Sequence, residues 1–285
     1  MLSIFTNPAA MSSNNSLNRA TGELNTSMER LGTGKRINAA KDDAAGLQIA
    51  TRLQGQSNGI SVAKSNINKA SALLQTAEGA FDEVSQILFR MKDLATQAAD
   101  DTNSAEDRKS LQSEFSALNS ELNNIMSNTS YGREKLLKSV SDNSVTGKLT
   151  QEMQFQIGAS KDEALKINMG ETLNSVTTSL ADLNTSDIQT SAAAGNAMLE
   201  KVNLALDDVG TMRSELGASV NRLGHTAKNL ANMKDNSDQS IGIIRDADFA
   251  AEASEMNRQN MLAQSSQMML KQSNQMSGLV MGMLG

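Results

Sequence analysis

The feature that most constrains this chain is a run of apolar residues between positions 60 and 98, spaced alternately by three and four. Every position of the pattern is apolar: Ile60, Ala63, Ile67, Ala70, Leu74, Ala77, Phe81, Val84, Leu88, Met91, Ala95 and Ala98. This spacing is typical of a helix that packs along its whole length against another helix. At about 1.5 Å per residue, a helix over residues 42–100 would be roughly 90 Å long, which predicts a rod.

A second stripe with the same spacing lies in the C-terminal half of the chain. Its members are Leu199, Val202, Leu206, Val209, Leu216, Val220, Leu223, Ala227 and Leu230, and only Arg213 interrupts it. We expect this helix to end near Asp235, and a third helix to start after an N-cap in the cluster 100–104. The predicted fold class is mainly α, a long antiparallel helical bundle or coiled coil.

Between residues 128 and 170 the pattern changes from helical to strand-like. Residues 154–158 and 165–169 alternate between polar and apolar side chains, and a short polar stretch separates them. This arrangement predicts a β-hairpin near 150–170. Residues 171–195 are the only ones left before the second long helix, so we expect a short helix there and no additional domain.

Each end of the chain carries an amphipathic segment. Residues 14–31 form the first, which two glycines, Gly32 and Gly34, should stop. The second starts near Phe249, after a joint over 236–248 that Gly242 should break. The apolar positions that recur every seven residues form a predicted assembly stripe: Leu17, Leu24, Leu31, Leu262, Met269, Met276 and Met283.

These two terminal segments are too narrow to bury their apolar faces against each other alone. We therefore predict that residues 1–33 and 247–285 form one domain that folds only on packing against other subunits. Residues 34–246 form the rod-like domain.

Composition excludes several classes of protein. The chain has one His, no Cys and no Trp, and its net charge is −6. Without cysteine there are no disulfides and no thiolate chemistry, and a net negative charge is unlike that of a nucleic-acid binder. No apolar run is long enough to span a membrane, and no basic-then-apolar leader opens the chain, so we expect no membrane insertion and no cleaved signal peptide.

The chemical candidates have simpler explanations. His225 has no second histidine for a metal site, and residues 32–35 lack the spacing of a phosphate-binding loop. The acidic pairs at 42–43, 100–101 and 207–208 fit helix caps and solvated faces. The methionines of the C-terminal segment fit a soft packing face better than a copper site. We predict no catalytic, cofactor-binding or metal residues, and no enzyme.

Residues 30–50, RLGTGKRINAAKDDAAGLQIA, closely resemble the N-terminal signature of bacterial flagellins. The resemblance continues in QTAEGA at 75–80, LATQAA at 94–99, FQIGA at 155–159 and DADFAAE at 246–252. It spans nearly the whole chain. With so few residues between hairpin and returning helix, the chain resembles a minimal flagellin without variable outer domains.

The resemblance implies a subunit that polymerises into the extracellular flagellar filament for swimming motility. Flagellins pair their two ends in an inner tube and surround it with long helices and a hairpin. They are exported unfolded through the flagellar apparatus, with a secretion chaperone on the C-terminal segment, and they meet junction and cap proteins. The implied partners are therefore other copies of the chain and these flagellar proteins.

Some flagellins are also recognised by Toll-like receptor 5. The matching residues here are Arg90, Leu94 and Glu114. Arg90 and Leu94 lie four residues apart on one helix face, and Leu94 lies just off the apolar stripe. The alternative role for this face is packing between subunits.

Two other functions fit parts of the pattern. A hook–filament junction protein has similar helical segments at its two ends, but the dense motif at 30–50 favours flagellin. A coiled-coil signalling or adaptor protein should carry a membrane span or a receiver surface, and neither is visible in the sequence.

Overall fold

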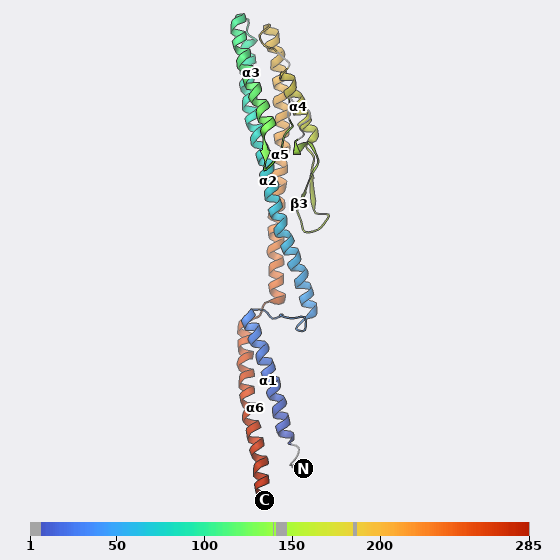
Figure 1. The fold of residues 1–285 in the computed structure, drawn as a ribbon, viewed down its shortest axis with the longest axis vertical. Helices are drawn as coiled ribbons and strands as arrows, with labels where there is room; N and C mark the ends of the chain where they lie inside the picture. Colours follow the sequence, from blue (N-terminus) through green and yellow to red (C-terminus); the bar gives the residue numbers. More distant parts are fainter. Residues whose placement is uncertain (1–6, 139, 141–146, 185–186, 285) are drawn as a thin grey trace. The chain divides into compact units, whose positions relative to one another are not determined.

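The computed structural model describes residues 7–138, 140, 147–184 and 187–284. The chain forms two compact units, one of Met1–Ser57 with Asp235–Gly285 and one of Asn58–Lys234. The two long helices, α2 (Ala44–Ala98) and α5 (Ala192–Arg245), contribute to both units. The predicted mainly α fold with a small hairpin is confirmed (Figure 1).

The core of the second unit lies along α2. All twelve positions of the predicted stripe between residues 60 and 98 are buried. Helix α3 (Ala105–Asn128) packs on α2 through Phe115, Leu122 and Met126, and α4 (Gly170–Asn184) lies beside α5 (Figure 1). Apolar residues from all four helices join in one continuous cluster. The spacing of three and four therefore marks the true packing face of α2.

The buried face of α5 differs from the predicted one by about one position. Between residues 198 and 223 its buried residues are Met198, Val202, Ala205, Val209, Met212, Leu216, Ser219 and Leu223. Four of them belong to the predicted stripe, whereas Leu199, Leu206 and Val220 of that stripe are only half-buried. Ala205 and Ser219 have small side chains, which a search for large apolar residues misses.

Arg213 does not interrupt this seam, because Met212 occupies the buried position. Its guanidinium lies beside α2 instead, where Nη2 is 2.9 Å from Asp82 Oδ1 and 3.5 Å from Glu78 Oε1. One cation between two carboxylates of the neighbouring helix helps to fix the register of α5 on α2.

Helix α3 starts at the predicted cap. The Ser104 hydroxyl accepts a bond from the Asp107 backbone N–H, and the Asp107 carboxylate accepts one from the Ser104 backbone N–H. This reciprocal capping box satisfies two backbone donors at the start of the helix. The Ser104 hydroxyl also donates to Asp107 Oδ2 at 2.6 Å, and this bond and the one from the Ser104 backbone N–H hold the pKa of Asp107 below its usual range.

The predicted β-hairpin is formed by β3 (Met153–Gln156) and β4 (Ala164–Ile167), paired antiparallel with Phe155 opposite Leu165. A second, shorter pair, β1 (Ser130–Tyr131) and β2 (Glu134–Lys135), was not predicted. Its turn contains Gly132 at φ 67°, a conformation that favours glycine. A 3-10 helix, η1 (Lys148–Thr150), precedes the hairpin, and the expected short helix is α4.

The predicted joint over 236–248 is wrong in extent. Helix α5 continues through Gly242 to Arg245, and only residues 246–248 link it to α6 (Phe249–Leu284). One glycine costs a helix about 1 kcal/mol, too little to break a segment whose Ser237 is buried and whose Gly242 carbonyl still accepts the Asp246 N–H at 2.8 Å.

Candidate functional site

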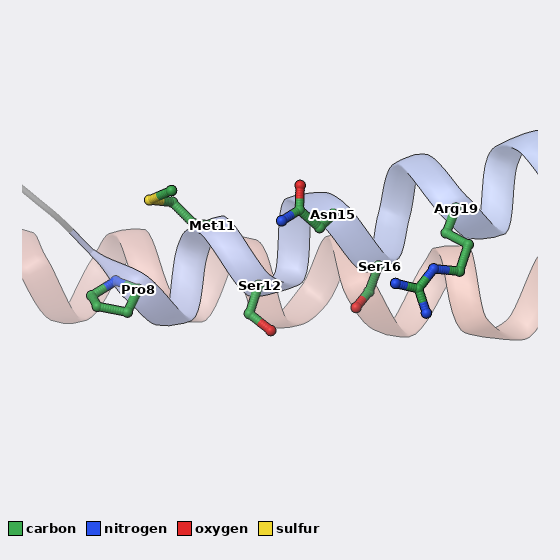
Figure 2. Close-up of a pocket in the computed structure, with 6 residues that line it drawn as sticks. All are labelled: Pro8, Met11, Ser12, Asn15, Ser16 and Arg19. Atoms are coloured by element: carbon green, nitrogen blue, oxygen red, sulfur yellow. The ribbon is translucent and has the colours of Figure 1, made fainter.

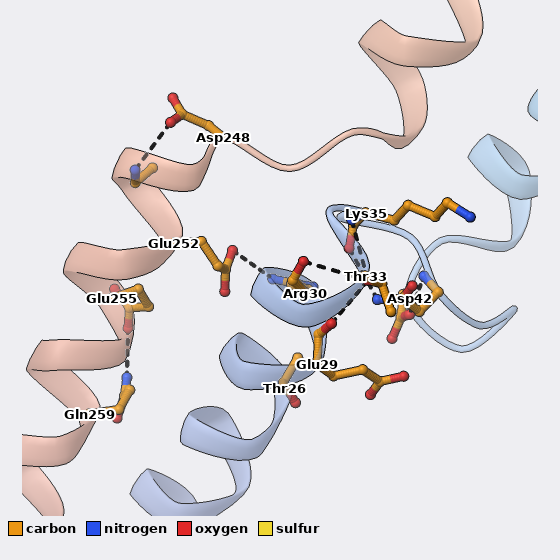
Figure 3. Close-up of polar contacts among 12 residues, drawn as sticks. Thr26, Glu29, Arg30, Thr33, Lys35, Asp42, Asp248, Glu252, Glu255 and Gln259 are labelled. Carbon is orange, nitrogen blue, oxygen red and sulfur yellow. Dashed lines mark hydrogen bonds and ion pairs between the residues drawn. The ribbon is translucent and has the colours of Figure 1, made fainter.

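The two terminal helices pack against each other in opposite directions. Helix α1 (Pro8–Thr33) begins at Asn7, whose side chain accepts the Ala10 N–H at 3.1 Å and donates to Ser273 Oγ at 2.9 Å. At the other end of α1, Arg30 Nη1 lies 3.7 Å from Glu252 Oε2 (Figure 3). Polar contacts at both ends therefore set the register of α1 on α6.

The seam between these helices is narrow and largely made of small residues. On α1 the fully buried residues are Ser13, Ala20 and Ser27, and on α6 Ala263 is buried. The predicted Leu17, Leu24 and Leu31 flank this line and are only half-buried. The buried residues of α1 recur every seven positions, and so do the predicted leucines. The predicted stripe therefore has the observed spacing but lies beside the most buried line of the helix.

The α6 part of the predicted stripe faces away from α1. Leu262, Met269 and Met276 are 48%, 63% and 56% exposed, whereas Ala263 of the seam is 8% exposed. Met261 and Met268 extend the same outer face. Met283 belongs to α6, but its side chain lies outside the part that the structure describes. We call Met261, Leu262, Met268, Met269 and Met276 the outer face of α6.

Helix α1 also presents a free face. An open groove of about 420 Å³ is lined by exposed residues one or two turns apart, shown in Figure 2: Pro8, Met11, Ser12, Asn15, Ser16 and Arg19. Its lining is mixed, with Met11 and Pro8 beside polar groups and one cation. Its residues can offer a neighbour hydrogen bonds, apolar contacts and the charge of Arg19.

The linkers that join the terminal helices to α2 and α5 run side by side and are hydrogen-bonded. Lys35 and Asp246 form an isolated antiparallel bridge, Arg36 N donates to Arg245 O at 2.7 Å, and Ala247 N donates to Gly34 O at 3.0 Å. Gly34 has a φ of 71°, which ends α1 in the left-handed conformation that glycine adopts without strain. The flagellin-like motif at 30–50 thus forms one of these two linkers. We call the hydrogen-bonded pair of linkers the joint.

Acidic residues hold the joint and the starts of the helices beside it. Asp42 Oδ2 accepts the N–H groups of Ala39 at 2.9 Å and Asn38 at 3.0 Å, and these bonds hold the pKa of Asp42 below its usual range. Asp43 caps α2 at Gly46, and Asp248 caps α6 (Figure 3). The pair 42–43 is therefore structural, as predicted.

The structure separates the three residues matched to receptor recognition. Arg90 and Glu114 form an exposed pair between α2 and α3, with Arg90 Nη2 and Nε 2.6 and 3.0 Å from Glu114 Oε1. Leu94 is 1% exposed and belongs to the core. Its position off the heptad stripe does not bring it to the surface, because α3 covers that side of α2.

No reactive centre gathers in the described part of the chain. His225 is exposed on α5. Among the described residues, no three His, Cys, Asp or Glu side chains lie close enough to hold a metal ion. The same residues include no helix with both the length and the hydropathy of a membrane span. The outer face of α6 gathers five exposed large apolar side chains between Met261 and Met276 of one helix.

Comparison with known proteins identifies two matching family models. Residues 4–142 match the bacterial flagellin N-terminal helical region, and residues 199–284 match the bacterial flagellin C-terminal helical region. The two models therefore cover the terminal helices, both long helices and α3.

Relatives match over their full length. Flagellin A of Vibrio anguillarum is 33% identical over an alignment of 385 residues that covers 99% of each chain. A flagellin of Halalkalibacterium halodurans is 37% identical over 279 residues, 98% of each chain. Because this chain has 285 residues, the Vibrio relative carries additional residues that this chain lacks.

Among solved structures, a putative flagellar hook-associated protein from Vibrio parahaemolyticus shares the fold with a TM-score of 0.56. It is 17% identical, and the match covers 72% of this chain and 99% of that one.

Proposed function

Because this chain belongs to the bacterial flagellin family and is a subunit of the extracellular flagellar filament, we propose that it joins neighbouring copies through the outer face of α6. The observation that carries the proposal is the exposure of five large apolar side chains on one side of a helix whose other side already packs on α1. Contiguous apolar surface of this kind marks an interaction site.

The chemistry of the face suits packing against copies of the same chain. Four of its five residues are methionines, whose unbranched side chains adapt to irregular surfaces. The α1 groove offers a second contact surface of matching character on each subunit, since Met11 and Pro8 are exposed there beside polar groups that a neighbour can satisfy.

The terminal helices gain part of their stability from this packing. Their mutual seam buries mostly Ser and Ala, which contribute little apolar area. Ordering the backbone costs about 1–2 kcal/mol per residue. We therefore infer that residues 1–33 and 247–285 fold as a domain when subunits assemble, and that residues 34–246 fold beforehand.

A double substitution tests the role of the outer face. Leu262→Gln with Met269→Gln replaces exposed apolar side chains by polar ones of similar length, and should block growth from filament seeds. Lys271→Gln, an exposed position on the same helix, is the matched control and should polymerise normally. Normal filament growth by the double variant would contradict the proposal.

The same face explains the need for protection before assembly. An exposed apolar helix aggregates unless it is covered, which supports a secretion chaperone on the C-terminal segment. Contacts with the export apparatus, junction and cap proteins belong to the same proposal. Binding of a purified flagellar chaperone should be lost when residues 249–285 are removed.

Recognition of the free subunit by Toll-like receptor 5 is a second candidate, favoured by the exposure of Arg90 and Glu114. Leu94 would support that surface from beneath, as part of the core. Arg90→Ala should then reduce receptor signalling by purified subunit while leaving its melting temperature within a few degrees. Unchanged signalling would exclude Arg90 from recognition.

A further inference from the structure

Twelve of the 17 methionines fall into two groups that differ in exposure, and Met233 and Met256 are half-buried. In the unit Asn58–Lys234 the buried ones are Met91, Met126, Met153, Met169, Met198 and Met212. On α1 and α6 the exposed ones are Met11, Met28, Met261, Met268, Met269 and Met276. An oxidant in solution therefore reaches the thioethers of the terminal helices first, because oxidation of a side chain follows its accessibility.

No more reactive side chain competes for that oxidant. The sequence has no Cys and no Trp, so methionine is its most readily oxidised residue type. Met261 and Met268 are both 66% exposed and lie seven residues apart, with Met269 and Met276 continuing the same helix face. Reactive sulfur is thus concentrated on one surface of α6.

We propose that Met261, Met268, Met269 and Met276 form an oxidative modification site, and that hydroperoxides acting on it control whether a free subunit can polymerise. This rests on the proposed role of the outer face in assembly. The thioether sulfur donates an electron pair to one peroxide oxygen, the O–O bond breaks, and an S=O bond forms. The sulfur is oxidised by two electrons, and hydrogen peroxide, reduced by two, leaves as water.

The product is incompatible with a dry interface. A sulfoxide is polar and branched at sulfur, and burying its oxygen without a hydrogen-bond donor is unfavourable. Four such groups lie on one face of each subunit, and they face away from the α1 seam. Oxidation should therefore stop assembly while leaving the fold of the second unit unchanged, because its described methionines are buried except for the half-buried Met233.

Assembly protects the same sulfurs. Once the outer face is covered by neighbouring subunits, peroxide no longer reaches it, so the modification acts on free subunits and not on completed filament. Because methionine sulfoxide reductases restore the thioether, the block is reversible.

The test uses the purified full-length subunit, limited hydrogen peroxide, and seeded growth followed by light scattering and electron microscopy. Peptide mass spectrometry should find sulfoxide at the four α6 methionines before any at Met91 or Met212. The critical concentration for growth should rise at least about tenfold. Treatment with methionine sulfoxide reductases A and B should return it to the starting value.

A variant with leucine at all four positions keeps the apolar face and removes the sulfur. It should polymerise, and peroxide should inhibit it far less than the wild type, because only Met11 and Met28 of α1 remain among the exposed methionines of the described residues. Equal inhibition of this variant and the wild type, or no recovery after the reductases, would overturn the proposal. If fully oxidised wild type polymerises normally while the double variant Leu262→Gln with Met269→Gln does not, the proposed oxidative control is wrong but the proposed function stands. If both polymerise, the proposed function fails as well.

Discussion

Arg30 of α1 and Glu252 of α6 form a partly buried ion pair, with 3.7 Å between Nη1 and Oε2 and side-chain exposures of 30% and 14%. Arg30 Nε and Glu252 Oε1 have no hydrogen-bond partner among the described residues. The pair is the one ion pair that the structure places across the described α1–α6 seam. It therefore sets the register of the terminal helices together with the hydrogen bond from Asn7 to Ser273.

Glu252→Gln should weaken the pairing of α1 with α6 by about 1 kcal/mol, because it leaves a partly desolvated guanidinium without its counter-charge. The measurement is the critical concentration for seeded growth, which should rise about fivefold. Glu255→Gln is the control, since Glu255 pairs only with Arg258 and Gln259 of its own helix. Equal effects of the two variants would remove the special role of Glu252.

Gly195→Ala should destabilise the second unit. A Cβ at this position would lie 2.6 Å from the Ala99 backbone nitrogen and 2.8 Å from its Cα, so the start of α5 must move away from the end of α2. We expect a loss of about 1–3 kcal/mol in the free energy of unfolding, measured with urea. Gly210→Ala, in the same helix with nothing within 4 Å, should instead gain up to about 1 kcal/mol.

Leu94→Ala should cost about 2–5 kcal/mol of unfolding free energy, because the side chain is fully buried. Phe89→Ala, at a position 58% exposed on the same helix, should cost far less. Thermal unfolding of both variants checks the burial directly. It also shows whether any loss of receptor signalling in a Leu94 variant reflects unfolding. Similar stability of the two variants would contradict the burial of Leu94 in the core.

Acid should loosen the joint between α1 and α2. The pKa of Asp42 is lowered by the bonds from Ala39 and Asn38, so its ionised form stabilises the joint above the ordinary aspartate value of about 3.9. That contribution is lost as the pH falls through the lowered pKa. The protection factor for amide exchange at Asn38 and Ala39, which is the intrinsic rate at each pH divided by the observed rate, should fall below about pH 4. In Asp42→Asn this protection factor should be low at neutral pH already. A wild-type protection factor that does not change with pH would contradict the account.

The packing face of α2 could be predicted from the sequence because its seam is made of large apolar residues at unbroken helical spacing. The seam of α5 was predicted only in part, at Val202, Val209, Leu216, Leu223 and Leu230, and that of α1 was not, because Ser219 on α5 and Ser13 and Ser27 on α1 are buried small polar residues. Polarity patterns cannot reveal small residues that are buried for steric reasons.

The sequence indicated which apolar residues of α6 recur at helical spacing, but not which side of α6 faces α1. Leu262, Met269 and Met276 were predicted as assembly residues, but apolar side chains also occur one position earlier, at Met261 and Met268. The polar contacts of Asn7 and Arg30, together with the small buried residues Ala20 and Ala263, mark which side of α6 meets α1. The burial of Leu94 could not be predicted either, since the position of α3 beside α2 depends on tertiary packing.

The most direct test of the outer face is hydroxyl-radical footprinting of the free subunit and of the assembled filament, read residue by residue. Labelling of Leu262, Met269 and Met276 should fall at least about tenfold on polymerisation, as expected for apolar side chains removed from water. Equal labelling of these residues in subunit and filament would contradict the claim that the outer face of α6 joins neighbouring copies.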